Sequence, residues 1–407
     1  MTQMIDIINR PIYTERIVPF INQNIIKVLT GQRRVGKSCI LRQIREYISA
    51  TWPNSNIIYI NKEFDDFAFI HTHEDLSAYV SGKLQLENKN FLFIDEIQDI
   101  IGFENTLRSL QAQSLCDIYV TGSNAMMLSS ELSTYLSGRY IEFHIRGLNY
   151  KEFLEFHKLV ADSSSLKSYL IFGGLPYLRN LPLQQELIFE YLRNVYSTII
   201  LKDVVKREGI RNVDFLETLA GYAADNVGNL FSANNISKYL KSQHVNISTL
   251  QVINYLRALQ NAFLINKVGR VEVNGLHKFE IGDKYYFEDL GLRNCNLVFS
   301  MQNDIHKLIE NAIYLHLSQL RYEVFTGSQS GGKEIDFVAR KSDEVVYVQS
   351  CYLLVDEATK QREFGNLLSI HNNYPKYVVS LDEWTSGSVV SGIKHLHLGE
   401  FLKLDTL

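Results

Sequence analysis

Short apolar runs alternate with amphipathic helical patterns in the first third of the chain. The runs are rich in Ile, Val and Phe and are too short for buried helices. Such runs, separated by helices, are typical of strands in a parallel sheet that is covered on both faces. We therefore predict an α/β domain with strands at Ile25–Leu29, Ile57–Ile60, Phe91–Ile94, Ile118–Thr121 and Tyr140–Ile145.

The pattern changes after residue 146. The segment Asn149–Val205 has helical spacing, broken at Gly173-Gly174-Leu175-Pro176, a combination that predicts a turn. A helix-rich piece with two strand-like runs spans Phe231–Asp289. A second α/β pattern then predicts a helix at Ile305–Leu320, strands near Glu323–Phe325, Glu334–Ala339 and Val345–Gln349, and a helix at Glu357–Ile370.

The piece between these two patterns resembles a winged helix. Two expected helices, Ala233–Lys241 and Thr249–Gln260, precede two strand-like runs, Asn261–Val268 and Lys284–Phe287, in the order helix, turn, helix and wing. Such a domain reads DNA through its second helix or serves for packing and protein contacts. The candidate base contacts are Gln251, Asn254, Arg257 and Gln260, and the candidate phosphate contacts are Lys238, Lys241 and Lys267.

Composition adds limits to this picture. Hydrophobic residues make up 46% of the 407 residues, charged residues 21%, and the net charge is −4; the charge counts against tight non-specific DNA binding but not against a local basic face. Strand-sized apolar runs predict no membrane span, and Met1 to Arg10 lacks the pattern of a signal peptide. Four cysteines without C-x-x-C spacing argue against a zinc site or a disulfide framework, so we expect a cytoplasmic protein.

One loop carries a specific chemical signal. The stretch Gly31 to Ser38 fits G-x-x-x-x-G-K-[ST] and lies between an expected strand and an expected helix. In this layout backbone N–H groups surround phosphate oxygens, Lys37 neutralises the β- and γ-phosphates and Ser38 ligates Mg²⁺. The predicted ATP contacts are Gly31, Gln32, Arg33, Arg34, Val35, Gly36, Lys37, Ser38 and Cys39.

Acidic and polar residues end two of the other expected strands. Asp95 follows Phe91–Ile94, where it can hold the magnesium shell, and Glu96 is placed to polarise an attacking water. Glu96 as a solvated acid at a strand end is the alternative. Ser123 and Asn124 follow the next strand, and either can contact the γ-phosphate.

Two readings of Asn61 also stay open. It restrains Glu96, or it is an ordinary turn residue at a strand end. The run Asn61-Lys62-Glu63 is followed by Phe64 where a guanine-reading motif has aspartate, so no GTP signature is present.

These motifs together resemble the AAA+ superfamily, and more narrowly the bacterial and archaeal ATPases that carry a C-terminal domain of unknown function. The resemblance rests on the Gly31–Ser38 loop, F-L-F-I-D-E-I-Q, T-G-S-N, Tyr135-Leu136-Ser137-Gly138-Arg139-Tyr140, Leu148-Asn149-Tyr150-Lys151-Glu152-Phe153 and the Gly173–Pro176 turn. The family has serine where this chain has Asn149. It implies a P-loop core over residues 1–146, a helical lid over 147–205, a winged helix over 206–298 and a PD-(D/E)XK nuclease-like domain over 299–407.

Arginines near the last strand of the core are candidates for stabilising transition-state charge. Arg139 could reach the γ-phosphate of a neighbouring subunit or of its own site. The alternative is an ion pair with Glu142. Arg146 is a weaker candidate for the same role.

The resemblance also implies a set of residues in the C-terminal domain. Glu310 and Asp336 could jointly hold Mg²⁺, and Gln349 stands in the (D/E) place. The expected lysine is replaced by Cys351, which has no positive charge at neutral pH. Lys360 is a candidate for a migrated lysine, and Asp356-x-x-Thr359-x-x-Arg362-Glu363 matches the family's helix. We expect a nuclease-like fold without nuclease activity.

Three functions fit these observations. The first is an ATPase that hydrolyses ATP to switch the arrangement of the later domains on DNA or on a protein partner. The second is an ATP-regulated, metal-dependent DNA nuclease, and the third is an ATP-binding scaffold that does not hydrolyse. Self-association is left open by the sequence.

Overall fold

The chain divides into two compact units. The computed structural model describes residues 8–125, 136, 138–273, 278–329, 332–354, 357–383 and 386–407. Tyr135, Ser137 and Asp356, which belong to motifs of the resemblance, lie outside these ranges. The N-terminal unit comprises Met1–Arg146 with Asn261–Phe263, and the C-terminal unit comprises Gly147–Gln260 with Leu264–Leu407.

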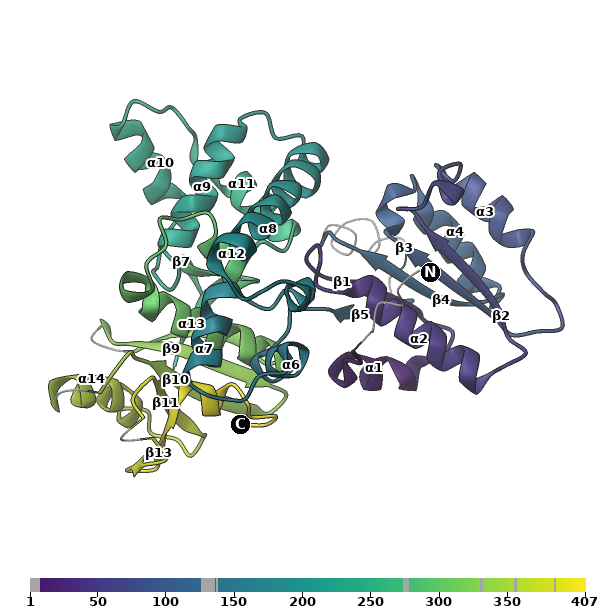
Figure 1. Ribbon diagram of the computed structural model, residues 1–407. Coiled ribbons are helices and arrows are strands. Elements are labelled where there is room, and N and C mark those ends of the chain that lie inside the picture. Colours follow the sequence, from purple (N-terminus) through teal and green to yellow (C-terminus); the bar gives the residue numbers. More distant parts are fainter. Residues whose placement is uncertain are drawn as a thin grey trace. The chain divides into compact units, whose positions relative to one another are not determined.

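A five-stranded parallel sheet forms the centre of the N-terminal unit (Figure 1), and it confirms the predicted α/β fold. The strand order is β2-β3-β4-β1-β5. The strands are β1 (Ile26–Thr30), β2 (Asn56–Asn61), β3 (Asn90–Asp95), β4 (Asp117–Gly122) and β5 (Tyr140–His144). The helices are α1 (Pro11–Ile17), α2 (Lys37–Thr51), α3 (His73–Ser81) and α4 (Phe103–Ala112), with the short 3-10 turns η1 (Val18–Phe20), η2 (Asp65–Phe67) and η3 (Ile97–Asp99).

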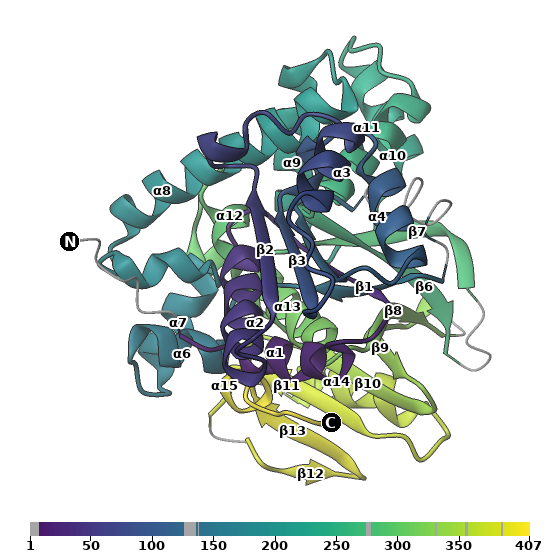
Figure 2. The same cartoon turned by 90° about the vertical axis from the view of Figure 1, so that its right-hand side faces the viewer.

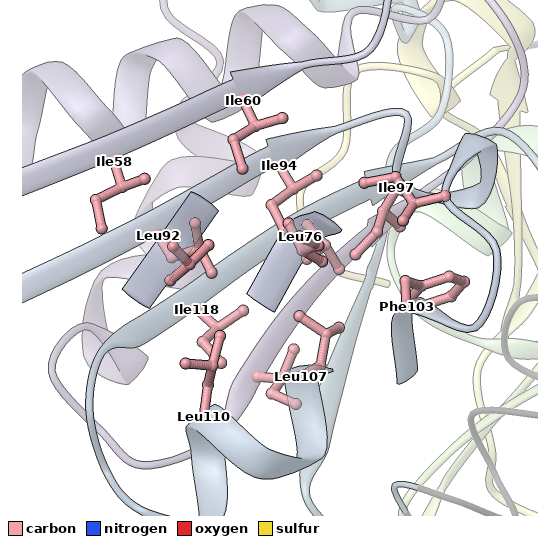
Figure 3. Close-up of a cluster of buried hydrophobic side chains, with 14 of the residues drawn as sticks. Ile58, Ile60, Leu76, Leu92, Ile94, Ile97, Phe103, Leu107, Leu110 and Ile118 are labelled. Atoms are coloured by element: carbon pink, nitrogen blue, oxygen red, sulfur yellow. The ribbon is translucent and has the colours of Figure 1, made fainter. Parts of the chain in front are cut away.

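Alternate residues of these strands build two separate apolar layers. Leu92 and Ile94 on β3 point to the face that carries α3 and α4, where they join Leu76 and Leu107 in one buried cluster (Figure 3). Side chains on a β-strand alternate between the two faces, so Phe93 lies on the other face, where its ring stacks on Tyr119. Burying each such side chain stabilises the fold by about 1.5–3 kcal/mol.

The C-terminal unit contains an eight-stranded mixed sheet in the order β12-β13-β11-β10-β9-β8-β6-β7. Its strands are β6 (Ile265–Glu272), β7 (Lys278–Phe287), β8 (Glu323–Ser328), β9 (Glu334–Lys341), β10 (Glu344–Ser350), β11 (Lys376–Ser380), β12 (Val389–Val390) and β13 (Ile393–His397). The predicted wing, β6 and β7, pairs with β8 through a parallel ladder. The predicted boundary at 298/299 therefore does not separate two sheets, because the hairpin forms one edge of the later sheet.

The helices of this unit precede the sheet in sequence or lie between its strands. Up to β6 they are α6 (Tyr150–His157), α7 (Ser163–Phe172), α8 (Gln185–Thr198), α9 (Val213–Asp225), α10 (Ala233–Ser242) and α11 (Thr249–Asn261), with η5 (Pro176–Asn180) and the π-helical η6 (Ile199–Lys206). After β7 they are α12 (Leu290–Asn294), α13 (Met301–Gln319), α14 (Glu357–Leu368) and α15 (Leu398–Phe401). The helix α14 lies along β10 and β11 (Figure 2). No helix within the described ranges has the length and apolar character needed to cross a bilayer.

Local contacts explain two motifs of the family resemblance, Leu148–Phe153 and Gly173–Pro176. Asn149 and Glu152 form a capping box at the start of α6. Asparagine and serine are both good N-caps, so the departure from the family's serine preserves the cap. Gly173 has φ +75°, and a Cβ there would lie 2.4 Å from a carboxylate oxygen of Asp289. The same Asp289 side chain accepts a hydrogen bond of 2.7 Å from the N–H of Gly174, which explains why the turn needs glycines.

Candidate nucleotide-binding site

The loop between β1 and α2 is shaped by two glycines. Gly31 has φ +141°, and a Cβ there would lie only 2.1 Å from the carbonyl oxygen of Ile145. Gly36 has φ +98° and is the N-cap of α2. Other residues rarely adopt such angles. The loop therefore curls onto the end of the sheet, and the first N–H groups of α2 face it, as an anion site requires.

The charged group of this loop is folded back onto its own backbone. The Lys37 side chain is buried, and its Nζ donates to the carbonyl oxygens of Gly31 and Gln32 at 3.0 Å each. Arg34, which lies between Gly31 and Gly36 in the loop, also has a positive φ of +73°. Ser38 and Cys39, at the start of α2, are exposed, as is Arg34, whereas Gln32 and Val35 are buried and Arg33 is half-buried.

A threonine links the two acids at the end of β3. The Thr121 hydroxyl donates to Oδ1 of Asp95 and accepts a 3.0 Å hydrogen bond from the backbone N–H of Glu96. Burial raises the pKa of Asp95, although the hydroxyls of Thr121 and Ser38 act in the opposite direction. A buried carboxylate beside a serine hydroxyl is a donor set that suits Mg²⁺.

The Glu96 side chain is held by neighbours that the sequence did not indicate as a group. Its backbone is left-handed, with φ +56°. Its Oε2 accepts from the amide of Gln98 and, at 3.3 Å, from the hydroxyl of Ser123. Ser123 and Asn124 are both buried. The Asn61 side chain instead accepts from the N–H of Glu63 at 2.8 Å and donates to the hydroxyl of Tyr59 at 3.2 Å, so these hydrogen bonds are local, as in a turn residue.

The register of β5 corrects the prediction for Arg139. The carbonyl oxygen of Arg139 accepts from the N–H of Ile26, at the start of β1. The P-loop begins at the other end of β1, roughly 13 Å away at about 3.3 Å per residue. This separation exceeds the length of an arginine side chain, so action on its own site is wrong. Action on a neighbouring subunit stays a prediction.

The structure also places Glu142, the partner in the alternative ion pair, and Arg146, the weaker candidate for the same role. Glu142 accepts from the hydroxyl of Thr30 rather than pairing with Arg139. The N–H of Ile145 donates to the carbonyl of Thr30 at 2.7 Å, so Arg146, the weaker candidate, lies at the edge where the loop begins. The backbone N–H of Arg146 also donates to the hydroxyl of Tyr13 at 3.0 Å.

The C-terminal unit brings its predicted metal ligands together around a lysine. Glu310 on α13 and Asp336 on β9 line one cavity of about 280 Å³, together with Gln349 and Cys351. Lys284 on β7 lies among the acids, with its Nζ 2.9 Å from Glu310 and 3.9 Å from Asp336. Cys351 is part of the apolar core, and burial raises the pKa of its thiol to about 12.

The cation beside these acids is therefore not the one that the sequence suggested. Lys360 on α14 makes no contact with Glu310 or Asp336 among the described residues. Lys284 fills that place because β7 is the edge strand that passes α13. A signal was present in the sequence, since Lys284 directly precedes the aromatic run Tyr285-Tyr286-Phe287, which the sequence assigns to a strand.

The candidate DNA contacts of the middle segment are partly engaged within the protein. Lys267 pairs with Asp283 at 2.9 Å. The side chain of Gln251 accepts from the N–H of Ser248, and that of Gln260 donates to the carbonyl of Leu256. The exposed surface of α10 and α11 includes Tyr239, Leu250 and Ile253, which are apolar, beside Lys238, Lys241, Asn254 and Arg257.

Two families match parts of the chain. Residues 23–154 match an AAA domain, which confirms that part of the resemblance, and residues 163–303 match a domain of unknown function (DUF8612). An uncharacterized protein of Haemophilus influenzae is 33% identical over 405 residues, covering 97% of this chain and 98% of that protein. An uncharacterized protein of Methanocaldococcus jannaschii is 30% identical over 381 residues, covering 88% of this chain and 80% of that protein.

Solved structures give weaker matches. The Aeropyrum pernix ORC1 protein in complex with DNA is 12% identical, with a TM-score of 0.32, over 71% of this chain and 92% of that chain. Cdc6p from Pyrobaculum aerophilum is also 12% identical, with a TM-score of 0.31, over 71% of this chain and 94% of that chain. Likeness at these scores carries no argument about function.

Proposed function

This chain belongs to the family of the Haemophilus influenzae protein to which it is similar over nearly its whole length, and from the AAA domain that residues 23–154 match we propose that it is an ATPase of the AAA class. In this proposal, hydrolysis of ATP in the Gly31–Ser38 site changes the arrangement of the C-terminal unit. The observation that carries it is the linked pair Asp95 and Glu96, which one threonine hydroxyl holds at the P-loop edge of the sheet.

Each residue of the site has a defined task in this proposal. The Lys37 ammonium exchanges its two carbonyl partners for phosphate oxygens, which carry more charge. The hydroxyl of Ser38 and the carboxylate of Asp95 would hold Mg²⁺, which would supply charge neutralisation at the phosphates. Glu96 orients and deprotonates the attacking water, while Gln98 and Ser123 fix its carboxylate. Asn124 is the second candidate for contact with the γ-phosphate.

A comparison of phosphate release tests hydrolysis. We expect Glu96→Gln to bind ATP but to release phosphate at least about 100-fold more slowly than the wild type, because a general base contributes that much or more. Glu74→Gln is the matched control, because Glu74 is an acid of the same unit whose side chain is 70% exposed. Equal and negligible rates in wild type and Glu96→Gln would favour the non-hydrolysing scaffold instead.

The division of the chain into two units supports the switching part of the proposal. Glu96→Gln should hold ATP without turnover, so it can trap the ATP state. We expect the hydrodynamic radius of this variant to change on addition of Mg²⁺ and ATP, and that of Lys37→Ala to stay constant. The same trapped variant, used as bait, should retain the partner that the ATP state binds.

The partner in this proposal is DNA or a protein, and α10 with α11 distinguishes them. Exposed apolar side chains on these helices, such as Leu250 at 65% exposure, favour a protein. The test is retention on DNA across a range of salt concentrations. If Lys238→Glu combined with Lys241→Glu leaves retention unchanged, this face does not bind DNA.

Phosphodiester cleavage is not part of the proposed function. The position of the expected lysine holds Cys351, a neutral buried thiol. Plasmid cleavage that required a metal ion and vanished in Asp336→Ala would contradict this exclusion.

A further inference from the structure

A buried lysine occupies the centre of the acidic cluster in the C-terminal unit. The Lys284 side chain is only 3% exposed. Its Nζ lies 2.9 Å from Oε1 of Glu310, 2.8 Å from Oε1 of Glu334 and 3.9 Å from Oδ1 of Asp336. A lysine surrounded by three carboxylates has the position that a bound cation would have.

One carboxylate oxygen of Glu310 and one of Asp336 are already saturated by protein donors. Oε1 of Glu310 accepts from Lys284 and, at 2.7 Å, from the hydroxyl of Tyr286. Oδ2 of Asp336 accepts two hydrogen bonds of 2.8 Å, from the N–H and from the hydroxyl of Ser350. Since an oxygen has two lone pairs, these two atoms have no capacity left for a metal ion.

The backbone closes the cluster on another side. A Cβ at Gly228 would lie 2.3 Å from Oε2 of Glu310. The glycine therefore lets the chain pack directly against this carboxylate. A metal ion that approached Glu310 would have to displace Lys284 or move this segment.

The Lys284 ammonium is enclosed by these carboxylates. Its Nζ lies within hydrogen-bond distance of both Glu310 and Glu334. A divalent ion would therefore have to displace a group that already neutralises the carboxylates. With Lys284 in place, no group of three or more His, Cys, Asp or Glu side chains among the described residues has the arrangement to hold a metal.

We propose that Lys284 is a built-in cation that takes the place of the divalent metal ion in this cluster. The pocket is then independent of metal, and the carboxylates that the family resemblance implies as metal ligands are ligands of the lysine. Removing the ammonium while keeping Glu310, Glu334 and Asp336 should convert the cluster into a divalent metal site, because three carboxylates then lack a counter-charge.

Binding of Mn²⁺ to the full-length chain without nucleotide tests this proposal. Lys284→Met removes the charge and keeps most of the length of the side chain, and Lys284→Arg is the matched control that keeps the charge. Asp336→Asn is introduced into the wild type and into each Lys284 variant, and the Mn²⁺ binding that it abolishes is assigned to this pocket. Free Mn²⁺ is measured by electron paramagnetic resonance, and the midpoint of thermal unfolding is measured with and without Mn²⁺.

The expected result is a gain of metal binding in one variant alone. Wild type and Lys284→Arg should bind no Mn²⁺ that depends on Asp336 at about 1 mM metal, and any shift of their unfolding midpoints on addition of Mn²⁺ should be the same with and without Asp336→Asn. Lys284→Met should bind one additional Mn²⁺, with a midpoint raised by about 4 °C or more, and both effects should vanish with Asp336→Asn.

Three results would overturn the proposal. The first is Mn²⁺ binding by the wild type that disappears in Asp336→Asn, a measurement that does not depend on any Lys284 variant. The second is a folded Lys284→Met that gains no Mn²⁺ site. If Lys284→Met does not fold, the double variant Lys284→Met with Glu310→Gln replaces it, because it carries less uncompensated charge and keeps two carboxylates. A gain of Mn²⁺ binding by this double variant supports the proposal. The absence of such a gain is the third refuting result.

Discussion

Replacing Thr121 should lower both the unfolding free energy of the N-terminal unit and the rate of ATP turnover. Its hydroxyl is fully buried, donates to the carboxylate of Asp95 and accepts from the N–H of Glu96. Thr121→Val keeps the shape of the side chain and removes both bonds. The charge-assisted bond contributes about 1.5–3 kcal/mol and the neutral one about 0.5–1.5 kcal/mol, so we expect the N-terminal unit to lose about 2–4 kcal/mol of unfolding free energy.

Turnover should fall further than stability alone explains. Glu96 has a left-handed backbone, and without Thr121 its N–H loses the partner that fixes it. A displacement of about 1 Å at a catalytic group costs about 100-fold in rate, so we expect this loss in phosphate release at saturating ATP. Unfolding in urea measures the stability of the same preparations.

Two controls isolate the effect. Thr121→Ser keeps the hydroxyl and should retain most of the activity. Thr106→Val removes a part-buried 2.7 Å hydrogen bond from the hydroxyl of Thr106 on α4 to the carbonyl oxygen of His73 on α3, so it should cost about 1 kcal/mol of stability and leave turnover unchanged. A Thr121→Val variant that releases phosphate within about twofold of the wild type would refute the role of the hydroxyl in positioning Glu96.

Three further outcomes follow from the same structure. Gly31→Ala should destabilise the N-terminal unit by about 3 kcal/mol or more in thermal unfolding. Gly138 also has a positive φ, but no atom lies within 4 Å of the added carbon, so Gly138→Ala should cost less. Equal losses in the two variants would contradict the close approach at Gly31. Arg139→Ala should abolish any rise of specific ATPase activity with protein concentration, and an unchanged concentration dependence would exclude action on a neighbouring subunit. Burial raises the pKa of Glu310 and the Lys284 ammonium lowers it, so loss of the ammonium in Lys284→Met should raise this pKa further. The unfolding midpoint of Lys284→Met should then fall more steeply than that of the wild type as the pH rises from about 5 to 8, and equal slopes would contradict the pairing of Glu310 with Lys284.

Much of the nucleotide site was predictable because its parts are contiguous in sequence. The loop Gly31–Ser38 needs only its own backbone angles and the helix that follows it. Asp95 and Glu96 follow an apolar strand, and the carboxyl ends of parallel strands meet at one edge of a sheet, so their place beside the loop follows from the strand pattern. The capping box of Asn149 with Glu152 is equally local, since three residues separate its members.

Features that depend on which strands pair, and in which register, were not predictable from the sequence. Arg139 and Arg146 lie at opposite ends of β5, and only the pairing of β5 with β1 shows that Arg146 is the one beside the P-loop. The continuous sheet that joins β6 to β8 is likewise a long-range pairing. A sequence pattern reports which residues alternate along a strand, but not which strand lies next to it.

The contact of Lys284 with the C-terminal acids was likewise not predictable from the sequence. The sequence by itself determined only that Cys351 stands where the family resemblance implies a lysine, so no local counter-charge for the C-terminal acids was expected at that position. Only the tertiary structure decided that a lysine from β7 supplies that charge, from 26 residues before Glu310 in the chain. The physical reason is that a buried carboxylate needs a cation within a few ångströms in space, and sequence distance does not constrain where that cation comes from.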